Sequence, residues 1–244
     1  MFRGATWQTT TMSFAARRAD TVFDALERGM GASDSASMSG AVTTGRTSTL
    51  MGETRQDLIE VIRQRGHRRL DEPVQLASGD WSRHFIDAKR ALARGSDLQR
   101  AAVALCDLAT EMGVGFDAVG GLTMGADQFA HAIAMVTDCE WFSVRKTPKG
   151  RGTNQRVEGA VLGPGRAVLL VDDVVTRGGS IADALGAIRE TGATVVAAVS
   201  LVDRGEFGRA VFNREGIPYR PLVTYADLGI PAVGSESGIT AATH

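Results

Sequence analysis

A chain of 244 residues with 43% apolar side chains is long enough for one α/β domain with appendages, at roughly 100–200 residues per domain. Its formal net charge of −1 gives no overall positive field that would attract nucleic acid or an anionic membrane, so any anion site must be local. No apolar stretch approaches the roughly 18 residues that a membrane helix needs, and the two cysteines, Cys106 and Cys139, have no neighbour at metal-ligand spacing. We therefore expect a reduced, cytoplasmic protein that binds neither nucleic acid nor membrane.

The first fifty residues differ in composition from the rest of the chain. Residues 31–49 are almost entirely Gly, Ala, Ser and Thr without periodicity, which predicts disorder, and residues 14–30 predict a short amphipathic helix. The first residues lack the apolar core of a secretory signal. We therefore expect residues 1–50 to be a dispensable low-complexity extension and residues 51–244 to be the folded domain, with Met51 as a candidate start.

From residue 52 onward, predicted helices and strands alternate. The first helix is expected to start at Thr54 and stop at Gly66, and turn residues 78–82 then join the two strands of a hairpin. Ser96 and Gln99 form a predicted capping box for the next helix. The elements are, in order, strands 74–77 and 84–87, helix 96–113, strand 118–121, helix 126–136, strands 141–144 and 168–171, helix 181–188 and strand 194–202. This alternation predicts an α/β fold with a parallel sheet, whose ligand binds at the carboxyl ends of the strands.

The stretch from Val168 to Ser180 carries the strongest functional signal. A buried apolar strand leads to the adjacent carboxylates Asp172 and Asp173, and a turn rich in hydroxyls and glycine then leads into a helix. Backbone N–H groups and the helix dipole bind anions there, while two carboxylates need partners such as Mg²⁺ or the diol of a sugar. Together these features indicate a phosphorylated ribose. The chain has neither G-x-x-x-x-G-K-[ST] nor G-x-G-x-x-G after a strand, which disfavours a P-loop and a dinucleotide site.

Residues 145–156 form an unbalanced basic cluster. Three arginines and two lysines, among them Arg145, Lys146, Lys149 and Arg151, occur there without an acid. A solvated basic loop is the ordinary explanation of such a run. We favour a flexible lid that closes on a polyanion, because it complements the phosphate site and would neutralise charge on a leaving pyrophosphate.

Residues 117–130 repeat the strand, turn and helix pattern with three glycines in the turn region. Glycine allows the backbone to approach anionic oxygens closely, although glycine turns after strands are common. Beside the other two anion sites, this segment predicts a cradle for pyrophosphate that includes Thr123 and Met124.

Two further positions are candidates for contacts with a planar ligand. Arg204 follows the buried strand 194–202, so its guanidinium reaches the same sheet edge and either holds an acidic ligand or forms a structural salt bridge. Trp81 and Phe85 near the hairpin are suited to stack on a heterocycle, although buried packing is the commoner arrangement. The histidines expected to be packed or surface residues rather than catalysts are His67, His84 and His131.

Residues 168–180 resemble the phosphoribosyl-pyrophosphate signature of the type I phosphoribosyltransferases. With three further motifs, the segment from residue 58 to residue 228 resembles one branch of that superfamily, the orotate phosphoribosyltransferases. The motifs are similar to S-G-x-x-S-x-x-[YF]-x-D at 78–87, R-K-x-x-K-x-H-G at 145–152, E-G at 158–159 and V-D-R at 202–204. The signature indicates the superfamily, and the basic and V-D-R motifs point to the orotate branch.

The resemblance implies a fold, an activity and an assembly. The type I phosphoribosyltransferase fold has a central parallel sheet flanked by helices, a small N-terminal hood and a flexible lid loop. The implied reaction is transfer of phosphoribose from 5-phospho-α-D-ribose 1-diphosphate to orotate in pyrimidine biosynthesis, giving orotidine 5′-phosphate and diphosphate, with Mg²⁺ as cofactor. The implied assembly is a homodimer in which the lid of one subunit serves the site of its partner.

The resemblance also implies roles on the phosphate side of the site. Asp172 and Asp173 would bind the ribose hydroxyls, directly or through Mg²⁺ and its waters. Residues 176–180 would hold the 5′-phosphate, with Thr176 also near orotate. The substrate-binding stretch comprises Val174, Val175, Thr176, Arg177, Gly178, Gly179 and Ser180.

Basic residues would act on the pyrophosphate and on the base. Arg145 and Lys149 are implied to be catalytic with the two aspartates, and Lys146, Lys149 and Arg151 would reach the pyrophosphate. Arg204 would contact the carboxylate or ring of orotate.

Two positions depart from the motifs of the orotate branch. Arg151 stands where the lid usually has His, so a near-neutral acid is absent, and Ala77 stands where several members have Lys before Ser-Gly. These departures keep two alternatives open. One is a phosphoribosyltransferase for another nucleobase, and the other is a non-catalytic regulator that binds phosphoribosyl pyrophosphate, for which an attached DNA-binding element would be the discriminating feature.

Overall fold

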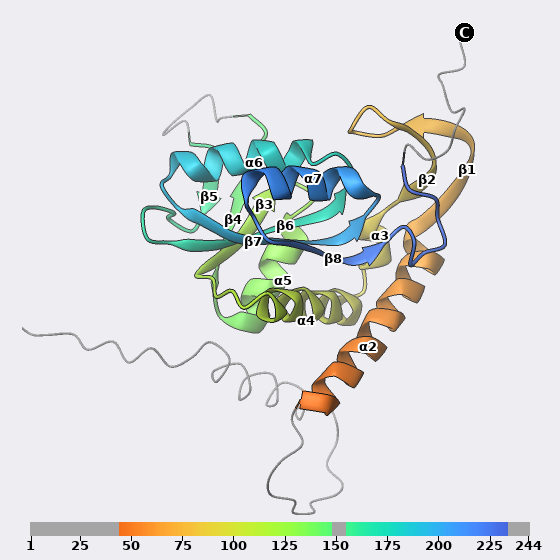
Figure 1. Ribbon diagram of the computed structural model, residues 1–244, viewed down its shortest axis with the longest axis horizontal. Helices are drawn as coiled ribbons and strands as arrows, with labels where there is room; N and C mark the ends of the chain where they lie inside the picture. Colours follow the sequence, from red (N-terminus) through yellow and green to blue (C-terminus); the bar gives the residue numbers. More distant parts are fainter. Residues whose placement is uncertain (1–43, 148–154, 234–244) are drawn as a thin grey trace, which may run out of the picture. The chain divides into compact units, whose positions relative to one another are not determined.

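The computed structural model describes residues 44–147 and 155–233, and its centre is a six-stranded sheet in the order β5-β4-β3-β6-β7-β8 (Figure 1). Neighbouring strands are parallel except for β5, which pairs antiparallel with β4. The strands are β3 Ala118–Leu122, β4 Glu140–Val144, β5 Val157–Gly159, β6 Ala167–Val175, β7 Thr194–Asp203 and β8 Tyr219–Thr224. The predicted α/β class with a mostly parallel sheet is therefore confirmed.

Helices cover both faces of the sheet. Helices α4 and α5 lie on one face, and α6 and α7 lie on the other (Figure 1). The central strand β6 is accordingly buried from both sides, and Val168 to Val171 are at most 1% exposed. This double burial explains why β6 reads as a continuous apolar run rather than an alternating one. The helices are α4 Gly95–Glu111, α5 Asp127–Thr137, α6 Gly179–Glu190 and α7 Glu206–Glu215.

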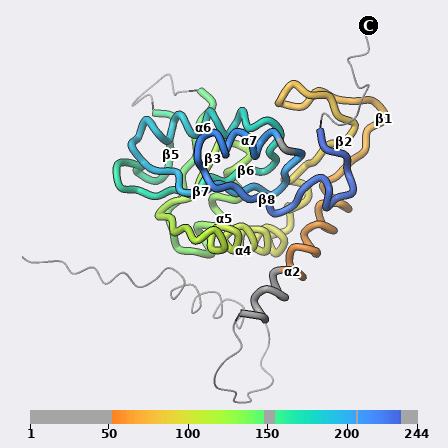
Figure 2. The backbone as a smooth tube through the Cα atoms, in the orientation of Figure 1, coloured from red at the N-terminus to blue at the C-terminus, as the bar shows by residue number. Residues whose placement is uncertain are grey.

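A smaller unit precedes the sheet and lies beyond the carboxyl ends of its central strands (Figure 2). It begins with α2 Thr44–Val61 and a π-helical turn at Ile62–Gly66. Strands β1 His67–Gln75 and β2 Trp81–Ile86 then form an antiparallel hairpin, and α3 Ala88–Ala91 follows. We call residues 67–91 the hood and residues 76–80, which join its strands, the hood turn. The hairpin predicted from its turn residues is confirmed, with longer strands than expected.

The start of the first helix differs from the prediction. Helix α2 begins at Thr44, so Thr54 lies inside it and does not cap it, and the disorder predicted for residues 31–49 is wrong for 44–49. The helix predicted at residues 14–30 lies outside the described residues, and the division of the chain at residues 50 and 51 stays a prediction.

The predicted capping box of α4 is also wrong. The N-cap of α4 is Arg94, whose side chain makes no capping hydrogen bond, and Ser96 lies within the first turn. The acidic residue of that turn, Asp97, instead accepts hydrogen bonds of 2.5 Å from Arg65 and of 2.5 Å from Arg100. The hydrogen bond from Arg65 therefore joins the start of α4 to the turn at Ile62–Gly66.

The far end of the sheet also differs from the prediction. Strand β6 continues to Val175, so Asp172 and Asp173 lie within the strand and not beyond its end, because β7 keeps pairing with them up to Asp203. Elements β5, α7 and β8 escaped prediction. Strand β5 has only three residues, and Pro221 interrupts the strand pattern of β8. The proline is tolerated because β8 lies at the edge of the sheet. None of the helices in the described ranges has the length and apolarity needed to cross a bilayer.

Candidate active site

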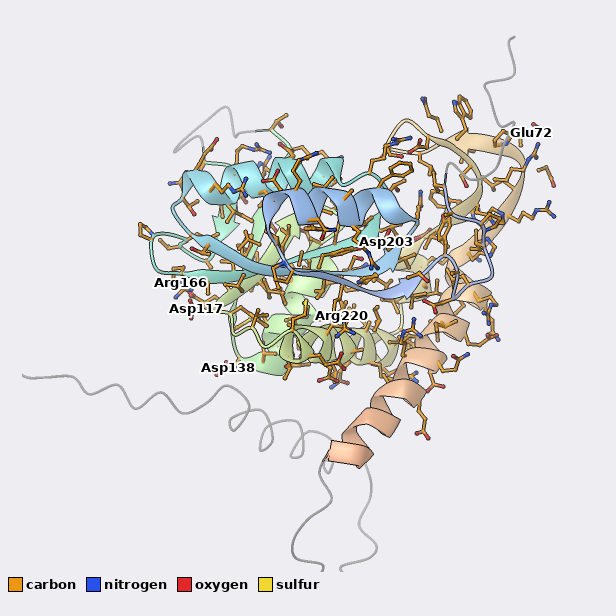
Figure 3. All side chains as sticks on the ribbon, in the orientation of Figure 1. Glu72, Asp117, Asp138, Arg166, Asp203 and Arg220 are labelled. Carbon is orange, nitrogen blue, oxygen red and sulfur yellow. The ribbon has the colours of Figure 1, made fainter. Side chains whose placement is uncertain are left out.

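The carboxyl ends of β6 and β7 bring the acidic strand, the loop after it and Arg204 to one edge. Val175 pairs with Asp203, and the N–H of Arg204 donates to the carbonyl of Val175 at 2.9 Å. Figure 3 shows Asp203 toward the hood end of the sheet, while Asp117 and Arg166 lie at the opposite end. The edge that the parallel topology predicts for a ligand is thus the edge that faces the hood.

The loop at residues 176–180, which we call the phosphate loop, leads from β6 into α6. Gly178 is the N-cap of α6 with a φ of +74°, a left-handed conformation that favours glycine, and it offers no capping side chain. The first N–H groups of α6 are therefore directed at the loop without a competing cap, which is how a helix N-terminus receives an anion.

A cavity of about 80 Å³ lies against the phosphate loop. It unites most of the residues predicted around the signature with two residues of the hood turn, Ala77 and Ser78. Its lining comprises Ala77, Ser78, Asp172, Val174, Val175, Thr176, Arg177, Gly178, Gly179 and Ser180.

The two carboxylates of β6 differ in environment. Asp172 is 8% exposed, whereas the Asp173 side chain is 24% exposed and has Lys89 Nζ at 3.6 Å from its Oδ2. The N–H of Asp173 donates to Asp172 Oδ1 at 3.0 Å, and the N–H of Val174 donates to Asp173 Oδ1 at 2.7 Å. Burial, and then the charge of Asp173, raises the pKa of Asp172. Two adjacent carboxylates repel each other, so they need a cation between or beside them.

The loop between β3 and α5, which the sequence predicts to be a cradle for pyrophosphate, lies against these carboxylates. A Cβ on Gly125 would be 2.8 Å from Asp173 Oδ1 and 3.0 Å from Asp172 Oδ1, so only glycine permits this approach. Thr123 Oγ1 donates to Asp127 Oδ2 at 2.6 Å, which fixes the loop to α5, and the Thr123–Met124 peptide is cis. Met124 is 69% exposed.

Arg204 lies at the end of β7 in a setting suited to an anionic planar ligand. It is only 6% exposed, and its guanidinium carbon lies 5.9 Å from the ring centroid of Tyr225. Burial lowers the pKa of Arg204, opposed by the charges of Tyr225 and Asp173. Its buried Nε has no hydrogen-bond partner within the described part of the chain. An orphaned buried donor of this kind is a natural contact for a carboxylate.

The aromatic and histidine predictions have mixed outcomes. Phe85 is half-buried with Arg68 stacked 5.5 Å from its ring centroid, and it does not line the cavity. His67 and His84 stack on each other with 2.9 Å between Nε2 and Nδ1, and His131 packs edge-on against Trp141. The prediction that these histidines are packed rather than catalytic agrees with these contacts.

The two ends of the basic segment are joined at its base. The N–H of Arg145 donates to the carbonyl of Arg156 at 2.8 Å, and Arg156 Nε donates to the carbonyl of Arg145 at 3.0 Å. Arg145 pairs with Glu158 at 3.3 Å instead of lining the cavity, and Lys146 is exposed. Lys149 and Arg151 lie outside the described residues.

Sequence reasoning missed Lys89. The chain contains only three lysines, and the other two, Lys146 and Lys149, belong to the basic segment. Lys89 lies two residues after Asp87, the last residue of the motif at 78–87, and the short helix α3 brings it to Asp173. The scarcity of lysine among 27 basic residues is the signal that could have found it.

Comparisons with known proteins agree with this arrangement. Residues 98–211 match the phosphoribosyl transferase domain family. The chain is 39% identical over 180 residues to the orotate phosphoribosyltransferase of Aquifex aeolicus, covering 71% of this chain and 97% of the relative. It is 38% identical over 192 residues to that of Corynebacterium glutamicum, covering 75% and 98%.

Solved structures give the same picture. The orotate phosphoribosyltransferase of Mycobacterium tuberculosis, solved in complex with 5-phospho-α-D-ribosyl 1-diphosphate, superposes with a TM-score of 0.60 at 30% identity, covering 72% of this chain and 99% of that one. The adenine phosphoribosyltransferase of Leishmania donovani superposes with a TM-score of 0.53 at 19% identity, covering 75% and 86%. The second likeness concerns the fold alone.

Proposed function

We propose that this chain, which belongs to the orotate phosphoribosyltransferase family, transfers phosphoribose from 5-phospho-α-D-ribose 1-diphosphate to N1 of orotate, giving orotidine 5′-phosphate and diphosphate in pyrimidine biosynthesis. The observation that carries the proposal is the meeting of three parts at one sheet edge. Asp172 lines one cavity with the phosphate loop. The loop between β3 and α5 approaches the acidic pair so closely that Gly125 admits no side chain beside Asp172 and Asp173.

Each part has a role in this reaction. The N–H groups of residues 176–180 hold the 5′-phosphate, and Asp172 and Asp173 accept hydrogen bonds from the ribose hydroxyls. The loop with Thr123 and Met124 receives the pyrophosphate. Breaking the bond from C1′ to the pyrophosphate oxygen leaves positive character on the ribose and negative charge on the leaving group, which the lid cations stabilise.

The part of the site that binds the nucleobase, which we call the base half, needs little proton transfer. Orotate is already anionic, so no strong general base is required for attack by N1. Arg204 holds the carboxylate of orotate through its unpartnered Nε, and the ring of Tyr225 lies against its guanidinium. The phenol of Tyr225 is itself held by the carbonyl of His84 at 3.4 Å, which links the base half to the hood.

The acidic pair fits Mg²⁺. No group of three or more His, Cys, Asp or Glu side chains that could hold a metal occurs in the part of the chain that the structure describes. Mg²⁺ is usually bound by one or two carboxylates together with substrate phosphates and waters, so a pair of aspartates beside a phosphate site is the expected donor set. Asp172 and Asp173 would hold the ion, directly or through its waters. When bound, Mg²⁺ neutralises charge on the pyrophosphate.

The direct test is turnover. Purified protein with Mg²⁺ and the donor should consume orotate, which is measured as the loss of the ultraviolet absorbance of orotate. Calorimetry should show that the donor binds. Donor binding without turnover of orotate, adenine, guanine or uracil would point to a regulator, and no binding of the donor would refute the proposal altogether.

A second readout uses the three lysines. We expect the donor with Mg²⁺ to protect Lys89, Lys146 and Lys149 from acetylation, as measured by mass spectrometry, because Lys89 lies 3.6 Å from Asp173 and the family resemblance assigns Lys146 and Lys149 to the pyrophosphate. Acetylation that does not respond to the donor would contradict the placement of these residues.

A phosphoribosyltransferase for another base is the second candidate. Ala77 lines the cavity at the position where several members of the orotate branch have Lys, and Arg151 replaces the lid His. Both changes fall on base or lid contacts and leave the phosphate loop intact. Faster turnover of a purine or uracil than of orotate would favour this candidate.

We also propose the homodimer with a lid that serves the partner's site. Lys149→Ala and Asp173→Asn protomers, each inactive alone, should complement when mixed. In a mixed dimer one site then carries both defects and the other carries neither, giving about a quarter of wild-type activity. If the lid served its own subunit, mixing would restore nothing. A cytoplasmic location and the dispensability of residues 1–50 stay predictions.

A further inference from the structure

The phosphate loop is bonded to the hood through one side chain. Arg177 Nε donates to Asp80 Oδ2 at 2.7 Å, and Arg177 Nη2 donates to Asp80 Oδ1 at 2.5 Å. The two residues lie 97 positions apart in the chain. A guanidinium that engages both oxygens of one carboxylate is held in a fixed orientation, which a single contact does not achieve.

Both partners are held from further sides. The guanidinium carbon of Arg177 lies 4.5 Å from the ring centroid of Phe207 in α7, so its face is also in contact. Asp80 Oδ2 additionally accepts from Ser78 Oγ at 2.9 Å, and the carbonyl of Asp80 accepts from the N–H of Leu76 at 2.7 Å. The Asp80 side chain is 14% exposed. The Nε and Nη2 groups of Arg177 are therefore both used in hydrogen bonds to the hood turn.

The pair adjoins the cavity. Ala77 and Ser78 of the hood turn line the cavity together with the phosphate loop, and Asp80 stands two residues beyond Ser78. Whatever holds Asp80 in place therefore holds this wall of the cavity. The hydrogen bonds of Arg177 also lower the pKa of Asp80, which keeps it charged near neutral pH.

We propose that Arg177 is a positioning residue that clamps the hood turn to the phosphate loop through Asp80, and that it is not a ligand of the donor's phosphate through its guanidinium. The inference rests on the proposed function, because it assigns the cavity wall to the donor. In this arrangement the loop N–H groups bind the 5′-phosphate, while the Arg177–Asp80 pair sets the width of the site. The clamp makes two residues from distant segments act as one unit.

The test is a double-mutant cycle on donor affinity. We expect Arg177→Ala and Asp80→Ala each to raise the Kd of the donor and of ribose 5-phosphate by a similar factor, about fivefold. The double variant should be no worse than either single one, because each change already releases the clamp. The factor for KM should exceed that for kcat, and the charge swap of Asp80→Arg with Arg177→Asp should recover part of the affinity.

Matched controls separate a clamp from general damage. Arg189→Ala removes an ion pair of 2.8 Å to Glu215 that also joins two elements but lies outside the cavity lining, so it should leave both Kd values unchanged. Asp80→Asn keeps the size of the side chain and should give the same direction as Asp80→Ala. Thermal unfolding of every variant checks that the fold is retained.

Hydrogen exchange gives a readout without ligand. Asp80→Ala should raise amide exchange in residues 177–180, and Arg177→Ala should raise it in residues 76–80, each across the contact. If the wild-type protein binds no donor, the proposed function fails, whereas unchanged exchange in both segments overturns the clamp by itself. Donor binding that tightens in Asp80→Ala but collapses in Arg177→Ala would show that Arg177 is a phosphate ligand and the proposal is wrong.

Discussion

In the phosphate half of the candidate site, residues 172–180 run without interruption from β6 through the phosphate loop into α6, whereas the base half draws on the hood, the end of β7 and the turn after β8. The first half rests on a strand that is buried on both faces. The second depends on contacts between segments that are far apart, such as Arg204 with Tyr225 and Tyr225 with His84. A site built in this way can keep its acidic pair and phosphate loop while other contacts change, and the departures at Ala77 and Arg151 leave residues 172–180 unaltered.

The lid is where the largest effect is expected. If Lys149 acts on the pyrophosphate as proposed, Lys149→Ala should lower kcat by about 10²- to 10³-fold, because a cation beside the leaving group contributes most where charge grows on it. Steady-state kinetics with calorimetric donor binding measure it, and Lys149→Arg should recover much of the loss. If kcat were unchanged and only KM rose, the segment would be an electrostatic attractor and not a lid.

A change in the phosphate half should affect binding as well as rate. Asp173→Asn removes charge beside the proposed Mg²⁺ site and should weaken Mg²⁺-dependent donor binding by about 10- to 100-fold. Titration calorimetry at several Mg²⁺ concentrations measures the effect. Asp71→Asn on the exposed side of β1 serves as the control. Equal loss with and without Mg²⁺ would mean that Asp173 contacts the ribose alone.

A change in the base half should separate the two substrates. Arg204→Lys retains the charge but loses the planar fork, so the KM for orotate should rise by about tenfold while donor affinity stays the same. Arg220→Lys is the matched control. Arg220 lies on β8 and forms an exposed ion pair with Glu111 of α4 (Figure 3). A parallel loss of donor affinity would contradict the division of the site into halves.

The contact between α4 and the turn at Ile62–Gly66, which precedes the hood, should depend on Asp97. Burial by itself raises the pKa of Asp97, but the hydrogen bonds and charges of Arg65 and Arg100 outweigh it, so the pKa is lowered. A lowered pKa gives stability that is present above the unfolded-state pKa and is lost as pH falls through the folded-state pKa. Asp97→Asn should cost about 1.5–3 kcal/mol of unfolding free energy near neutral pH, measured by urea unfolding. The difference from wild type should vanish in acid, and a constant difference at every pH would exclude the ionic explanation.

The smallest expected effect has the opposite sign. The pKa of Asp172 is raised by burial and by Asp173, so ionisation of this group opposes folding once pH exceeds its unfolded-state pKa. Without donor and metal, Asp172→Asn should therefore stabilise the fold at neutral pH by about 1 kcal/mol, or roughly 2–4 °C in Tm, while activity is lost. The gain should disappear below the unfolded-state pKa, where both states are protonated. Destabilisation at neutral pH would show that Asp172 is satisfied in its charged form.

Much of the fold and of the phosphate half follows from local pattern. Strands β3, β4, β6 and β7 were predicted because apolar runs between glycine turns report burial directly. The hairpin was predicted from its turn residues. Strand β8 was missed because Pro221 interrupts the strand pattern, although an edge strand tolerates a proline. The Ser96 capping box failed because Arg94, two residues earlier, is the N-cap of α4.

Local pattern specifies the part of the protein in which neighbours in the chain are also neighbours in space, above all the passage from Val168 to Ser180. The contacts of Lys89 with Asp173, of Asp80 with Arg177 and of Arg204 with Tyr225 are visible in the folded chain alone. The physical reason is that periodicity and turn chemistry act over a few residues, whereas these contacts depend on how the hood packs against the sheet. Residue types alone show that a charge needs a partner, but the packing selects which one.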